Sequence, residues 1–116
     1  MIVSNSGNVE YRRAVYDQDR KGIHIPAAQL DGSGFEVGDA FSVKKGQREM
    51  FSLTIVKDDS GDILFDKSGI FIERTRRVDI FLGGIFDEYT VYLHGGSNPM
   101  EIRLKPIDPL VERLGY

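Results

Sequence analysis

Short apolar stretches separated by glycine-containing turns most restrict what this sequence can fold into. The chain has 13 glycines among 116 residues, whereas about 7% is usual in soluble proteins, and most of them fall between the apolar stretches. No apolar pattern of helical period is longer than about eight residues. These features disfavour a helical bundle and predict a mainly β chain with short helical turns.

Alternation of apolar and polar residues predicts the individual strands, because successive side chains of a strand point to opposite faces. The clearest example is residues 50–56, which place Phe51, Leu53 and Ile55 on one face and two hydroxyl side chains on the other. Further strands are expected over 9–16, 22–25, 40–43, 63–65, 69–73, 78–82, 89–93 and 100–105.

Residues with special backbone preferences predict the connections between these strands. Pro26 suits the first turn of a short helix, and Gly38 with Asp39 suits a turn into the next strand. Gly61 is available for a positive φ in a hairpin turn. A second short helix is expected over 108–115, where an Asp-Pro pair opens it and a glycine closes it.

Several residue types that catalysis needs are missing. The chain has no cysteine and only two histidines, which excludes a disulfide framework, a thiol nucleophile and zinc sites made of cysteines or three histidines. It contains no phosphate-binding loop, dinucleotide motif or serine nucleophile elbow, and the aspartates over 58–66 lack the spacing of a calcium loop. We therefore expect no catalytic residue, no cofactor and no metal, in a protein that is not an enzyme.

Charge and hydropathy narrow the class of protein further. The net charge of −3 and the isoelectric point near 5.3 argue against a strongly basic nucleic-acid binder, although basic residues can still gather locally. The first residues lack the apolar stretch of a signal peptide, and the longest uncharged apolar run, IFLGGIF, is too short to cross a bilayer. The expectation is one cytoplasmic β-rich domain over 1–116, with no membrane association.

A weak internal repeat relates residues 9–56 to residues 70–106. If it is real, the two halves pack around a pseudo-two-fold axis and share one core. Chance similarity between two β meanders is the alternative. The segments that correspond are 20–25 with 76–80, 35–43 with 86–93, and 52–56 with 101–105.

The segments GIHIPAAQL, over 22–30, and GFEVGDAFSV, over 34–43, resemble the AbrB/SpoVT-like swapped-hairpin domain. That family has a short strand ending in Ile-Pro, one helical turn, a glycine with an apolar residue, a Gly-Asp turn and a strand. The resemblance covers about residues 9–56, and the second half of the chain matches only through the repeat. It implies a small β-barrel-like swapped-hairpin fold, formed as a homodimer or as a tandem pseudo-dimer.

The same resemblance implies a function, because members of that family are mostly DNA-binding transcription regulators and antitoxins. A SymE-like branch of RNA-acting toxins shares the fold. Two departures weaken the implied DNA binding more than the implied fold. The Gly-Arg pair usual before the second strand is Lys21-Gly22 here, and the short helix reads Gln29-Leu30-Asp31, without the family's basic residues.

Clustered basic residues are the candidate contacts to DNA, because mobile cations at the ends of strands suit the phosphate backbone. Two alternatives stay open. The cations can form a solvated surface balanced by 18 acidic residues. The aromatic residues can be interpreted as stacking platforms for single-stranded nucleic acid, but core packing explains them more simply. The residues expected to contact phosphates are Arg12, Arg13, Arg20, Lys21, Arg76 and Arg77.

Three functions therefore compete. The first is a DNA-binding regulator or antitoxin, acting as a dimer and, for an antitoxin, with a toxin as protein partner. The second is a non-enzymatic interaction or assembly module that binds a protein through exposed sheet edges or an aromatic patch; the acidic isoelectric point favours it. The third is a SymE-like RNA-acting toxin.

Overall fold

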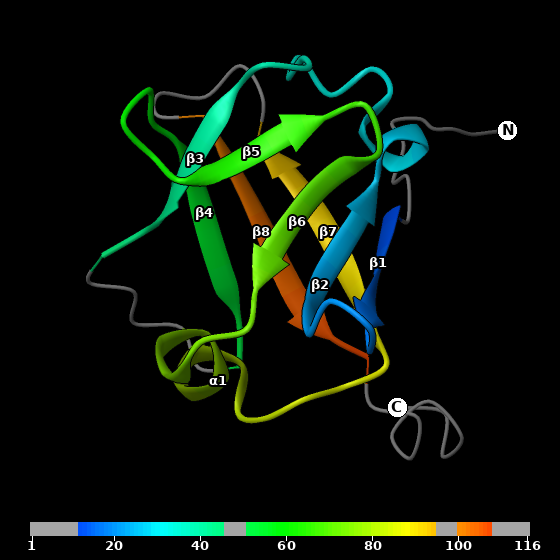
Figure 1. The fold of residues 1–116 in the computed structure, drawn as a ribbon, viewed down its shortest axis with the longest axis vertical. Coiled ribbons are helices and arrows are strands. Elements are labelled where there is room, and N and C mark those ends of the chain that lie inside the picture. The colour runs from blue at the N-terminus through cyan, green and yellow to red at the C-terminus, as the bar shows by residue number, and fades with distance from the viewer. Residues whose placement is uncertain (1–11, 46–50, 95–99, 108–116) are drawn as a thin grey trace, which may run out of the picture.

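A computed structural model of the chain describes residues 12–45, 51–94 and 100–107. Within these residues eight antiparallel strands close into a barrel, in the order β1-β2-β6-β5-β3-β4-β8-β7 (Figure 1). The strands are β1 (Arg12–Asp17), β2 (Gly22–Pro26), β3 (Ala40–Val43), β4 (Leu53–Lys57), β5 (Ile63–Asp66), β6 (Gly69–Glu73), β7 (Glu88–His94) and β8 (Glu101–Pro106), with a 3-10 turn η1 (Ala27–Leu30) and a helix α1 (Arg76–Leu82).

The prediction of a mainly β, barrel-like fold with short helical turns is confirmed. Inward-facing residues of neighbouring strands meet in register, as Leu53 of β4 does with Leu104 of β8 and Ile55 with Ile102. All four side chains are fully buried. The core is therefore the barrel interior, filled by the alternating apolar residues that predict the strands.

The connector after β2 also has the predicted form. Pro26 ends β2 and η1 follows at once. Gly38 adopts φ 103° in the turn before β3, and the ring of Phe35 packs edge-on against Phe41, 5.3 Å between centroids. This packing fixes the connector to the barrel core.

The expected strand over 78–82 is wrong, because these residues belong to α1. The hydroxyl of Thr75 accepts a hydrogen bond from the N–H of Val78, which caps the helix, and Gly83 ends it in the left-handed conformation. Val78 and Leu82, four residues apart, are buried, whereas Ile80 is 69% exposed. Three apolar residues at alternate positions fit a strand, but the cap, the glycine and the neighbouring turns favour a helix.

This helix bears on the proposed repeat, in which residues 76–80 correspond to a strand in the first half. That correspondence is wrong, since β2 is a strand and α1 a helix. The remaining correspondences join β3 with β7 and β4 with β8, which are strands in both halves. The repeat as a whole, and with it the pseudo-dimer, stays a prediction.

The strand predicted over 50–56 begins later than expected. β4 starts at Leu53, and Phe51 precedes it with φ 57° and 57% exposure. Both polar residues of the alternation, Ser52 and Thr54, are buried, so this segment is covered on two sides. The predicted residues 9–11 of the first strand, and the helix over 108–115, lie outside the described residues.

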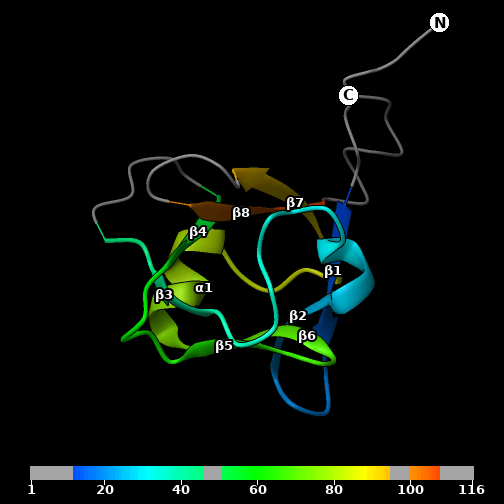
Figure 2. The same cartoon turned by 90° about the horizontal axis from the view of Figure 1, so that it is seen from above.

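Helix α1 lies at one end of the barrel, beneath the side formed by β3, β4 and β5 (Figures 1 and 2). Its two buried side chains, Val78 and Leu82, join the core cluster. The helix therefore covers the core at this end of the barrel. In the part of the chain that the structure describes, no helix has the length and apolarity to cross a membrane.

Candidate functional site

The barrel wall has a gap beside the short strand β5. The ladder between β3 and β5 ends at the pair Phe41–Ile63, and the ladder between β5 and β6 ends at Phe65–Ile70. Both outer strands continue beyond these pairs. Since neighbouring strands lie about 4.8 Å apart, β3 and β6 are two spacings apart where β5 lies between them. On the side of Ile63, the first residue of β5, β3 and β6 continue without a strand between them. The gap between β3 and β6 is therefore one strand wide there.

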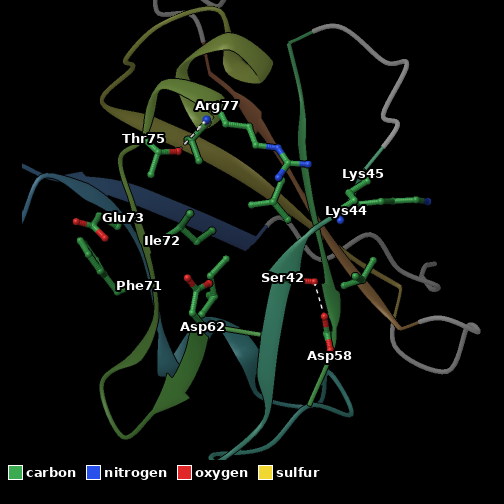
Figure 3. A pocket seen from close by; sticks show the side chains of 14 residues that line it. Ser42, Lys44, Lys45, Asp58, Asp62, Phe71, Ile72, Glu73, Thr75 and Arg77 are labelled. Carbon is green, nitrogen blue, oxygen red and sulfur yellow. Dashed lines mark hydrogen bonds between the residues drawn. The ribbon is translucent and has the colours of Figure 1, made fainter. Parts of the chain in front are cut away.

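This gap forms a cleft of about 890 Å³, near the upper end of the roughly 300–1,000 Å³ of ligand-binding pockets. Helix α1 bounds it at the end away from β5, and β3 and β6 form its sides (Figure 3). Its apolar lining consists of Val43, Val56, Ile63, Phe71, Ile72 and Val78. The cleft therefore combines an apolar floor with strand edges.

On β3, the backbone groups of Val43 point into the cleft. The N–H of Lys44 donates to the carbonyl oxygen of Thr54 at 2.8 Å, and that of Asp58 donates to Ala40 at 2.9 Å. Even-numbered residues of β3 thus direct their backbone groups to β4. Because these groups alternate in direction along an antiparallel strand, those of Val43 are directed to the opposite side.

The same alternation holds on β6, the other side of the cleft. The N–H of Arg74 donates to the carbonyl oxygen of Lys21 at 3.0 Å, and that of Ala27 donates to Ser68 at 3.0 Å. Even-numbered residues here direct their backbone hydrogen-bonding groups to β2. The backbone groups of Glu73 are therefore directed into the cleft, facing those of β3.

Gly61, in the turn before β5, closely approaches the backbone of β3. A β-carbon on Gly61 would lie 2.1 Å from the carbonyl oxygen of Phe41, which leaves no room for any side chain. The prediction that Gly61 provides a positive φ is wrong, since it is not among the positive-φ glycines. Glycine is needed there because the turn before β5 packs on the backbone of β3.

The two ends of the cleft differ in net charge. Arg77 of α1 and Lys45, after β3, lie at the helix end together with the carboxylate of Glu73, and Asp62 lies beside the start of β5 (Figure 3). Neither Arg77 nor Asp62 forms an ion pair with another described residue; the guanidinium of Arg77 lies 5.8 Å from the ring centroid of Phe81.

Two other charged residues of the cleft have partners within the chain. The ammonium group of Lys44 lies 2.7 Å from a carboxylate oxygen of Glu101. The carboxylate of Asp58 accepts hydrogen bonds from the hydroxyls of Ser60 at 2.7 Å and Ser42 at 2.9 Å. These bonds hold the pKa of Asp58 below its usual value, so that it is ionised at neutral pH.

The six predicted phosphate contacts do not form one face. Arg12 and Arg13 begin β1, at the end of the strand opposite the turn that holds Arg20 and Lys21. A strand of this length spans about 20 Å. Arg12 donates from Nη1 to the carbonyl oxygens of Gln29 at 2.5 Å and Asp31 at 2.9 Å, and thereby holds η1 against the barrel.

Arg13 and Arg20 also have partners within the chain. The guanidinium of Arg13 lies 2.6 Å from the carboxylate of Glu88. That of Arg20 lies 2.8 Å from Asp17 and stacks on the ring of Phe71, 4.3 Å from its centroid. These cations stabilise local structure, although surface ion pairs of this kind contribute little.

The structure brings the other predicted cations closer together. Lys21 accepts the backbone hydrogen bond of Arg74, and α1, which carries Arg76 and Arg77, begins two residues later. Arg76 and Arg77 are both exposed, and of the two Arg77 lines the cleft. The sequence analysis did not identify the cleft. The only signal for it was the small number of residues between the turns on either side of β5, which predicts a short strand.

No protein-family model, curated protein or solved structure matches the chain. The resemblance to the AbrB/SpoVT-like family therefore stays a prediction. Among the described residues, no group of three or more His, Asp or Glu side chains is placed to hold a metal ion.

Proposed function

We propose that this chain is a protein-interaction module that binds an extended segment of a partner protein in the cleft between β3 and β6. The observation that carries the proposal is the one-strand-wide gap beyond β5, with strand edges on both sides. Adding a strand to an exposed sheet edge is a common mode of peptide recognition, in which backbone bonds supply affinity and side-chain pockets supply specificity.

The bound segment completes the barrel wall. Its backbone groups meet those of Val43 on one side and Glu73 on the other, and its inward side chains cover Ile63 and Ile72 on the cleft floor. From Phe41 the cleft follows β3 for about four residues, or roughly 14 Å of strand. So short a segment buries less than the roughly 1,200–2,000 Å² of stable interfaces, and we expect a transient complex.

A random peptide library displayed on phage, selected against the full chain, tests the proposal. Selected peptides should bind the purified protein and should lose at least tenfold in affinity on Val43→Pro. This substitution removes an N–H directed into the cleft and none of those directed to β4. Glu73→Pro makes the same change on β6 and should have the same effect.

Val37→Pro is the matched control. Val37 lies in a turn in which Asp39 donates to the carbonyl oxygen of Glu36 and Gly38 has φ 103°, so that it occupies the turn position that proline favours. This variant should fold and keep full peptide affinity. Failure to select any peptide, or equal binding by folded Val43→Pro and wild type, would overturn the proposal.

DNA binding as a regulator or antitoxin is the second candidate, favoured by one observation. Lys21 and the start of α1 lie at the same barrel end, where Arg20 and Arg76 add two further cations. A gel-shift titration against salt tests it, because phosphate contacts weaken steeply as salt rises. Absence of binding at about 50 mM salt excludes this candidate, and loss of binding in Lys21→Glu with Arg76→Glu supports it.

A further inference from the structure

We infer the direction and the charge pattern of the bound segment: it lies antiparallel to β3 and β6, with an acidic side chain near its amino end and a basic side chain near its carboxyl end. The inference rests on the proposed function and adds the class of peptide that the cleft selects. Two independent features carry it, which are the directions of the strands and the placement of the charges.

The strand directions fix the orientation. β5 is antiparallel to both β3 and β6, so these two strands are parallel to each other, and both run from β5 toward α1. A segment that continues the path of β5 is antiparallel to both of its neighbours, as every other strand of the barrel is. Antiparallel pairing is also slightly more stable per residue than parallel pairing.

In this orientation the amino end of the segment lies beside α1 and its carboxyl end lies beside Asp62. The last residues of the segment abut Ile63, the first residue of β5. A parallel segment would have its ends reversed. The orientation therefore determines which end of the peptide meets which charge.

The charges determine the side chains at the two ends. At the helix end of the cleft, Arg77 and Lys45 supply two cations against the one carboxylate of Glu73 (Figure 3), so a carboxylate near the amino end of the segment meets a net positive charge. Asp62 and the ionised Asp58 lie at the other end, where a lysine or arginine meets them. Complementary charges of this kind fix register and partner choice.

The experiment compares two synthetic peptides of equal composition with blocked ends. One has glutamate first, then alternating valine and threonine, then lysine; the other has the same residues in reverse order. Fluorescence anisotropy should show that the wild type binds the acid-first peptide at least tenfold more tightly. Exposed charges are screened by salt, so the preference should shrink in 0.5 M NaCl.

Arg77→Glu combined with Asp62→Lys removes the excess of positive charge at the helix end and the excess of negative charge at the other end, because Lys45 and Asp58 remain. Both substituted residues lie on the surface. This double variant should lose the preference for the acid-first peptide. Arg76→Glu is the matched control, because Arg76 is on the same helix and does not line the cleft; its preference should equal that of the wild type.

The outcomes separate the inference from the proposed function. Equal binding of both peptides, or a preference of the wild type for the reversed peptide, overturns the charge pattern. In either case loss of binding on Val43→Pro still supports a strand-binding cleft. If neither peptide binds although library peptides do, the charge pattern is again wrong. If no peptide of any kind binds, the proposed function fails first.

Discussion

Truncation of two apolar residues of α1 gives opposite results for a helix and for the strand that alternation predicts. In a strand, Ile80 and Leu82 lie on the same face, and both are buried or both exposed. In the helix, Leu82 is 1% exposed and Ile80 is 69% exposed. The substitutions Leu82→Ala and Ile80→Ala therefore distinguish the two.

The expected magnitudes follow from burial. Leu82→Ala removes three buried carbons, worth about 0.8 kcal/mol each, and leaves a cavity at the barrel end, so that the total loss is about 2.7–5 kcal/mol. Ile80 is less than one-third buried, so Ile80→Ala removes much less buried apolar surface than Leu82→Ala. The better helix propensity of alanine offsets part of this loss of stability. Its free energy of unfolding should change by no more than about 0.5 kcal/mol.

Urea denaturation followed by circular dichroism measures both free energies of unfolding. In a domain of this size 1 kcal/mol shifts the midpoint of thermal unfolding by roughly 4 °C, so Leu82→Ala should unfold roughly 10 °C or more below the wild type. Equal losses for the two variants would refute the helix. The third residue of the pattern, Val78, is buried like Leu82 in the helix and would share the face of Leu82 in a strand, so it does not discriminate.

Substitutions at three further positions test other parts of the structure. Gly61→Ala should lower the free energy of unfolding by about 1–3 kcal/mol, as overpacking does; an unchanged urea midpoint would show that the turn does not press on β3. Thr75→Ala removes the helix cap and should cost about 1 kcal/mol, and Thr75→Ser should restore most of it. The hydrogen bonds from Ser68 lower the pKa of Asp66 below its ordinary 3.8, so its contribution to stability is present above that pH and is lost as the pH falls through the folded-state value. Thermal midpoints between pH 5 and pH 2 should fall less steeply for Asp66→Asn than for the wild type.

Much of the fold was predictable because the barrel has a local signal. Alternating residues such as Ile102 and Leu104 have to face one side of a strand, and Pro26 and Gly38 have few other backbone positions to occupy. Residues 78–82 show where this reasoning fails. Over five residues, apolar positions at i, i+2 and i+4 are compatible with both a strand and a helix, and only the capping residues Thr75 and Gly83 distinguish them.

The candidate cleft was not predictable in the same way, because it depends on which strands become neighbours. The turns before and after β5 limit that strand to four residues, and a short strand at the edge of an open sheet would leave no cleft. β5 leaves one only because it pairs with β3 on one side and β6 on the other, both of which continue past it toward α1. Strand order is a long-range property that alternation does not encode.

Basic pairs in the sequence do not by themselves show which cations are available to a partner. A cation is available to a partner only if the fold leaves it without an internal acceptor, and acceptors distant in sequence determine this. Arg12 is held by carbonyl groups 17 and 19 residues away and Arg13 by a carboxylate 75 residues away, whereas Arg77 extends into the cleft from the helix that ends it. The same type of side chain therefore stabilises the barrel at the start of β1 and, under the proposed function, selects the partner segment at the start of α1.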